Sequence, residues 1–101
     1  MKKVGKRMIA WRDAKILLNP AFERAGIETC EIRYRGCTHW HQGYAHSLKR
    51  RNIPRGSALL FEVIKSCNFC HGIIEDLGEK RMSGIVRAII ANRVRPVEIN
   101  L

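Results

Sequence analysis

The sequence predicts a small α+β domain built around a metal ion that is bound by cysteine. All four cysteines and all four histidines of the chain lie in one window, residues 30–71. Alternating side chains predict short strands within this window, and apolar residues at helical spacing predict helices on both sides of it. At 101 residues the chain forms one domain. We divide it into a basic helical segment (1–26), a metal-binding core (27–78) and a C-terminal amphipathic helix with a tail (79–101).

The flanking segments contain the helical patterns. Apolar side chains between Lys3 and Leu18 recur at an imperfect helical spacing, and we expect Asn19-Pro20 to interrupt that helix. A second, short helix would begin at Pro20 and end at Gly26. Residues 79–94 repeat apolar side chains at three- and four-residue steps opposite basic ones, which predicts an amphipathic helix whose basic face meets solvent or nucleic acid. Residues 97–101 are expected to extend a sheet edge or to contact a partner.

The core alternates extended and helical patterns. Residues 30–35 alternate, which predicts a hairpin or an extended loop, and residues 43–48 fit a short strand. The apolar run at residues 57–64 fits a buried strand or a transition from helix to strand. Residues 71–77 are expected to form a helix that ends at Gly78.

The cysteines have the spacing of a structural zinc site. Cys67 and Cys70 are separated by two residues, so one tight turn directs both thiolates at one ion, and Cys30 and Cys37 form a wider second pair. Four thiolates close a tetrahedral site and leave no position for a substrate. Four cysteines also allow three disulfide pairings. No apolar run approaches the roughly 20 residues of a membrane span, so we expect a cytoplasmic protein, in which thiols more often bind metal.

The charge of the chain points to a polyanionic partner. The formal net charge is +10 at pH 7, and nucleic acid is the commonest partner of so basic a small domain. Four cations lie close together just after His46 and form a predicted phosphate-binding patch; the alternative is a solvated turn. These cations are Lys49, Arg50, Arg51 and Arg55.

The histidines offer a second, more open site once the cysteines are committed to zinc. His46 ends the predicted strand, and His71 directly follows Cys70. His71 and Glu75 are four residues apart, so on a helix they share a face. His39 and His41 lie in a loop around Trp40, where at least one of them is expected to be exposed to solvent.

This ordered set of motifs resembles the HNH endonucleases with the ββα-metal, treble-clef zinc fold. The motifs are a Cys-Glu-Ile knuckle, an Ala-His-Ser strand end followed by a basic run, and a Cys-x-x-Cys-His turn that opens a helix. The closer likeness is to small phage-encoded members, and it covers roughly residues 27–77. The resemblance implies a phage or prophage protein of the bacterial cytoplasm that hydrolyses DNA with a divalent metal ion.

The resemblance also implies roles for individual residues. His46 matches the general base, and His71 with Glu75 matches the ligands of Mg²⁺ or another divalent ion. The four cysteines match the structural zinc ligands of many members. Ala45 stands where the family usually has a metal ligand, so His41, Glu62 or water replaces that ligand, or the site is degenerate. Glu62 stands where the family has its central asparagine, from which a carboxylate orients His46 or joins the metal.

Three functions are consistent with these patterns. The leading hypothesis is a metal-dependent DNA endonuclease. The second is a non-catalytic zinc module that binds DNA or RNA and has a degenerate HNH site. The third is a protein-interaction adaptor with incidental charge. The sequence leaves the oligomeric state and the DNA specificity open.

Overall fold

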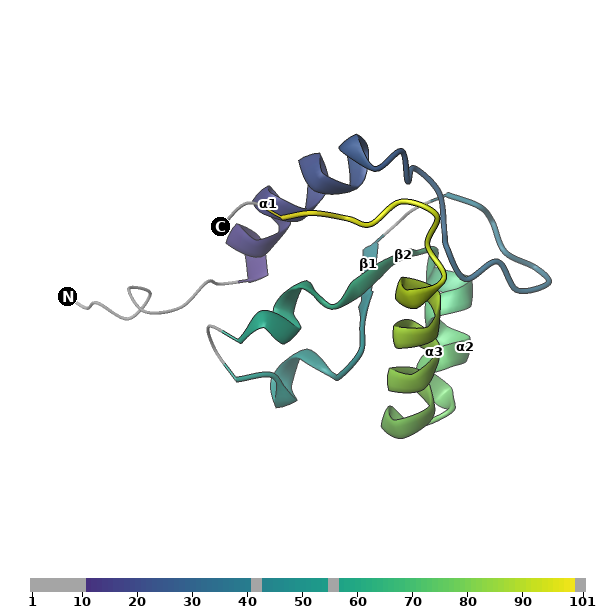
Figure 1. Cartoon of the computed structure of the whole chain (residues 1–101). Coiled ribbons are helices and arrows are strands. Elements are labelled where there is room, and N and C mark those ends of the chain that lie inside the picture. The colour runs from purple at the N-terminus through teal and green to yellow at the C-terminus, as the bar shows by residue number, and fades with distance from the viewer. Residues whose placement is uncertain (1–10, 41–42, 55–56, 100–101) are drawn as a thin grey trace.

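The chain folds into a small mixed α/β domain, shown in Figure 1 as a computed structural model. The structure describes residues 11–40, 43–54 and 57–99. In this part of the chain, three α-helices accompany one antiparallel sheet of two strands. The helices and strands are α1 (Trp11–Arg24), β1 (Gly43–His46), β2 (Val63–Ser66), α2 (Asn68–Asp76) and α3 (Glu79–Ala91).

Helix α1 is continuous through Pro20, so the expected interruption at Asn19-Pro20 is wrong. A proline inside a helix costs about 3 kcal/mol. The buried face of the helix, which includes Leu18 and Phe22, offsets this cost, since each such side chain gains about 1.5–3 kcal/mol on burial. Gly26 does close the helix: it has φ +78°, and the next N–H, of Ile27, bonds back to the carbonyl of Phe22.

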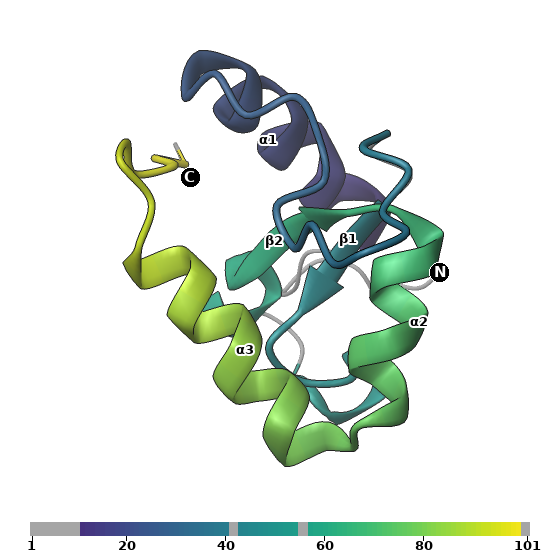
Figure 2. The same ribbon diagram turned by 90° about the vertical axis from the view of Figure 1, so that its right-hand side faces the viewer.

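The two-stranded sheet lies between the helices, as Figure 2 shows. In its register Ala45 faces Ile64 across the strands, and His46 faces Val63. Because successive side chains of a strand point to opposite faces, the two pairs enter different clusters. Ala45 and Ile64 pack with residues of α2 and α3, whereas Val63 packs with Phe22 of α1. The sheet therefore aims His46 and Ala45 in opposite directions.

The apolar run before β2 is a transition from helix to strand. A 3-10 turn, Ala58–Phe61, comes first, and the hydroxyl of Ser57 accepts a hydrogen bond from the N–H of Leu59. Strand β2 then leads to Cys67, which caps the N-terminus of α2. A second 3-10 turn, Arg50–Asn52, follows β1 and carries part of the predicted basic patch.

Arg93 corrects the expected basic face of the C-terminal helix. The sequence pattern places Arg93 on the solvent side, but its side chain is only 9% exposed. Its guanidinium donates two hydrogen bonds of 2.9 Å to the carboxylate of Glu31 and one of 2.9 Å to the carbonyl of Val63. It also lies 4.9 Å from the ring centroid of Phe22. Arg93, which lies just beyond the end of α3, therefore connects this helix to Glu31 and to strand β2 through largely buried hydrogen bonds.

The tail returns along α1 (Figure 1). Val97 and Ile99 pack against the cluster beneath α1, and Arg24 donates a hydrogen bond of 3.1 Å to the carbonyl of Glu98. Up to residue 99 the tail therefore covers its own domain instead of extending the sheet. Within the described residues, every helix is too short or too polar to cross a membrane.

Candidate functional site

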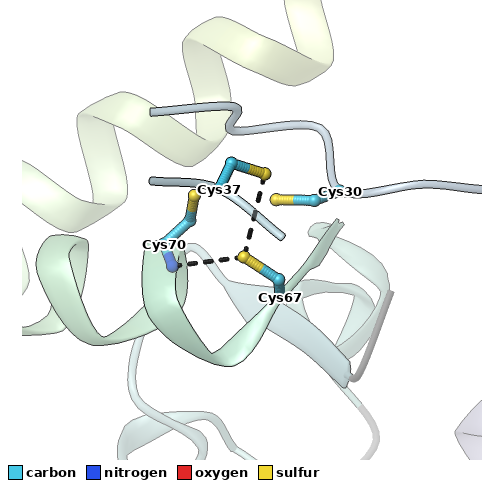
Figure 3. Close-up of side chains that lie close together, drawn as sticks. All are labelled: Cys30, Cys37, Cys67 and Cys70. Atoms are coloured by element: carbon cyan, nitrogen blue, oxygen red, sulfur yellow. Dashed lines mark hydrogen bonds between the residues drawn. The ribbon is translucent and has the colours of Figure 1, made fainter. Parts of the chain in front are cut away.

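The four cysteines meet at one point, although they come from two separate segments (Figure 3). Their sulfur atoms all lie within 4.8 Å of one another, and the sulfurs of Cys37 and Cys67 are 3.8 Å apart. Tetrahedral zinc with bonds of about 2.3 Å separates its sulfur ligands by about 3.8 Å. A disulfide needs about 2.05 Å, and all four thiols are free. The cluster therefore has the donor set and the dimensions of a metal site.

Backbone N–H groups turn toward these sulfurs. The N–H of Cys70 lies 3.4 Å from the sulfur of Cys67, and that of His39 lies 3.2 Å from the sulfur of Cys37. Burial opposes ionisation of Cys67, but hydrogen bonds from Cys70 and Thr38 lower its pKa below the ordinary value. Burial and the adjacent sulfurs raise the pKa of Cys70. The surroundings thus favour the thiolate form of Cys67 and disfavour that of Cys70. A bound divalent cation would stabilise both thiolates.

A separate cleft of about 670 Å³ contains the predicted histidines. His46 comes from the end of β1, and His71 and Glu75 come from α2. Helix α1 supplies another wall, and the basic segment after β1 supplies the rim. The cationic and amide side chains lining the cleft are Lys15, Asn19, Lys49, Arg50 and Arg51.

His46 is held as a neutral imidazole. The residue is 5% exposed, and its ring centroid lies 4.3 Å from that of Trp11. Burial, then the positive charge of Arg50, then His71 lower the pKa of His46 to about 4. Its Nε2 is buried and has no hydrogen-bond partner among the described residues. A buried ring nitrogen without a hydrogen-bond partner costs folding free energy, so the position of this atom calls for a functional explanation.

His71 and Glu75 share a face of α2, as the four-residue spacing predicts. The Nε2 of His71 lies 3.9 Å from a carboxylate oxygen of Glu75, and the two side chains are 30% and 52% exposed. One imidazole and one carboxylate form part of a coordination shell for a divalent cation. In the part of the chain described, only the cysteine cluster gathers three or more such ligands.

The carboxylate of Glu62 has a partner outside the cleft. Glu62 directly precedes β2 at the end of a 3-10 turn, and its carbonyl accepts a hydrogen bond from the N–H of Ser47. Its carboxylate accepts a 3.0 Å hydrogen bond from Arg87. Partial burial opposes ionisation, but hydrogen bonding and the charge of Arg87 lower the pKa of Glu62. Among the described residues that line the cleft, Glu62 is absent, and its role toward His46 or a metal ion stays a prediction.

The remaining predicted residues divide into two groups. Ala45 is fully buried and packs with Ile64, so position 45 faces the core and not the cleft. A ligand at this position would point away from His46. His41 and Arg55 lie outside the described residues.

The contribution of α1 to the cleft was not predicted. Trp11, Lys15 and Asn19 follow one another at four-residue spacing, so they lie on one helical face. The ring of Trp11 has the guanidinium of Arg50 5.3 Å away and the ammonium of Lys15 5.9 Å away. The spacing was readable in the sequence, but nothing there indicated which element this face would cover.

No family model matches the chain, and neither the curated proteins nor the solved structures include a significant match.

Proposed function

We propose that the protein is a zinc-stabilised, metal-dependent DNA endonuclease of the HNH type, with β1, β2 and α2 as its ββα-metal, treble-clef element. The observation that carries the proposal is the composition of the cleft. One concave site contains a buried imidazole with a free nitrogen, an imidazole and carboxylate pair, and a rim of cations. Metal-dependent phosphodiester hydrolysis needs a general base that deprotonates water, ligands for a metal ion, and cations that bind the phosphate.

The cysteine cluster and the pair of His71 and Glu75 would bind different metal ions with different roles. Zinc bound by four thiolates is closed to substrate. It would hold the loop of residues 30–40, here called the knuckle loop, against the start of α2. His71 and Glu75 would bind Mg²⁺ or another divalent ion on the next turns of the same helix. When bound, that ion neutralises charge on the scissile phosphate and on the leaving oxygen. Because His71 directly follows Cys70, a zinc ion bound by the cysteines would also hold His71 in place.

His46 accepts the proton of the attacking water. With a pKa of about 4 the imidazole is unprotonated at neutral pH, so its lone pair is available in essentially every molecule. Proton transfer creates an imidazolium, which the negative charge of the bound phosphodiester favours. Lys49, Arg50 and Arg51 bind the phosphates on either side and fix the strand against the cleft.

The proposal is tested by nicking of supercoiled plasmid DNA in Mg²⁺, Mn²⁺ or Ni²⁺. His46→Ala should lower the rate about 100-fold or more, the usual contribution of a general base. His39→Ala is the matched control, because His39 is an exposed histidine of the knuckle loop that does not line the cleft. Zinc content and far-UV circular dichroism verify that both variants fold. Equal nicking by His46→Ala and the wild type would remove the mechanism.

The burial of Ala45 favours a second candidate, a non-catalytic zinc module that binds nucleic acid. Position 45 contributes no ligand, and His71 with Glu75 alone is a weak cation site. This candidate predicts one bound metal ion per chain instead of two. It also predicts binding that weakens with salt in proportion to the phosphate contacts, without cleavage. Metal analysis at high Mn²⁺ concentration separates the two candidates.

A further inference from the structure

A large aromatic side chain, Trp40, projects from the knuckle loop outside the histidine cleft. Trp40 is 75% exposed, whereas a tryptophan ordinarily buries most of its surface. Trp11, the other tryptophan, is half-buried against His46. Neither the closed cysteine site nor the proposed hydrolysis uses Trp40, so its exposure has no explanation within the functions described above.

The backbone beneath Trp40 is fixed. Trp40 forms an antiparallel bridge with Thr29, and the carbonyl of His39 accepts a 3.0 Å hydrogen bond from the N–H of Cys30. His39 has φ +68°, an uncommon value for a residue with a side chain, and its own N–H bonds to the sulfur of Cys37. Contacts with Thr29, Cys30 and Cys37 therefore hold the backbone that carries the indole, which lowers the backbone entropy lost when a ligand packs on it.

An arginine bonds to Cys30 and to Thr29, the residue that pairs with Trp40. Side chains paired across an antiparallel bridge leave the same face, so Thr29 and Trp40 project together. The guanidinium of Arg33 donates a 3.5 Å hydrogen bond to the hydroxyl of Thr29. Arg33 is exposed and has φ +58°, a second uncommon conformation on this loop. Arg35, also exposed, adds positive charge to the same loop.

We propose that Trp40 and Arg33 form a contact site for an unpaired DNA strand, in which the indole stacks on a nucleobase and the guanidinium binds a phosphate. This inference rests on the proposed function and names its substrate more closely, as DNA with unpaired bases near the cleaved bond. An exposed aromatic ring beside a cation is the arrangement by which proteins bind single strands without reading sequence. In a duplex the base faces are stacked on one another and closed to Trp40.

The position of Trp40 along the chain connects it to the cleft. Gly43 lines the cleft and is three residues beyond Trp40, so their α-carbons are at most about 11 Å apart. A strand that lies across His46 and continues past Gly43 would come close to the indole. Trp40 would hold the unpaired part of the strand while Lys49, Arg50 and Arg51 hold the part in the cleft.

The test is equilibrium binding of the zinc-loaded protein, without added Mg²⁺, to fluorescent oligonucleotides measured by anisotropy. The probes are oligo(dT) and an abasic oligonucleotide of the same length, which has the same phosphates and no bases. Trp40→Leu should weaken oligo(dT) binding about fivefold to 150-fold, the range for loss of one stacked base. It should leave abasic binding unchanged. Trp40→Phe should retain most of the affinity for oligo(dT).

Three outcomes overturn the inference in distinguishable ways. If Trp40→Leu weakens both probes equally, Trp40 is structural. If Trp40→Leu changes neither probe while the wild type binds and nicks DNA, only the stacking site is wrong. If the wild type binds neither the two probes nor duplex DNA, both the stacking site and the proposed nucleic-acid function are wrong. A wild type that binds oligo(dT) without nicking plasmid would instead remove the endonuclease and keep the stacking site.

Discussion

Acid should destabilise the protein through His46, because the folded chain keeps this imidazole uncharged. Its folded pKa is about 4, against 6.5 for an unperturbed histidine. Between these values the unfolded chain binds a proton that the folded chain does not bind, so the free energy of unfolding decreases as pH falls. The difference of about 2.5 units, at about 1.4 kcal/mol per unit, gives a loss of about 3 kcal/mol between pH 6.5 and pH 4. At 5% exposure the group is little screened by solvent.

The assay is urea denaturation of the zinc-loaded wild type and of His46→Gln at several pH values across this window. Acid also protonates zinc-bound thiolates, which weakens the metal site. Both proteins keep the four cysteines, so this contribution cancels in the difference between them. The wild type should lose up to about 1.4 kcal/mol per pH unit more than His46→Gln. Above pH 6.5 the difference should stay constant.

The histidine can also be followed directly by its imidazole proton resonances in NMR. A midpoint near pH 4 for His46 is the expected result. A midpoint near 6.5, or parallel pH dependence of the two proteins, would show that burial beside Trp11 and Arg50 does not hold the ring neutral. The proposed base would then be half protonated in mildly acidic solution, and its cleavage rate should fall there.

The other predictions concern the metal, the buried ion pair and the core. Removing zinc with a chelator should unfold the domain, because metal binding of about 10 kcal/mol equals the whole stability of so small a chain; helical circular dichroism that persists without zinc would contradict this. Arg93→Met should cost about 3–5 kcal/mol in urea denaturation, because Glu31 keeps a buried charge without its partner. The exposed control Arg95→Met should change stability by less than about 0.5 kcal/mol. Ala45→Asp should lose at least about 2 kcal/mol and gain no bound Mn²⁺, because position 45 faces the core; a second bound ion would refute the assignment.

Local sequence signals predicted the parts of the fold that depend on neighbouring residues. The Cys-x-x-Cys spacing led to the turn at the start of α2, and the four-residue spacing of His71 and Glu75 led to their shared face. Gly26 ended a helix as expected, although that helix is the continuous α1 and not a short one that begins at Pro20. Each of these features is decided within a few residues. The strand at residues 43–46 was found for the same reason, since alternation is a local pattern.

Features that depend on distant packing were missed. Pro20 is a strong local stop, and only the burial of Phe22 against the sheet shows why the helix continues. Arg93 fits a solvent face by helical period, and nothing near it in sequence reveals that Glu31 will be its partner. Glu62 was considered only beside His46, and nothing near it in sequence reveals that Arg87 of α3 bonds to its carboxylate.

The tie made by Arg93 has a consequence for how the domain is synthesised. Its partner Glu31 precedes it by 62 positions, so the two can meet only after this whole stretch of chain has left the ribosome. Until then the knuckle loop can be joined to strand β2 by the hydrogen bonds between Glu31 and Lys65, but it lacks its contact with the segment that follows α3. The four cysteines can come together once Cys70 has emerged, whereas the contacts of Arg93 with Glu31 and Val63 form only afterwards.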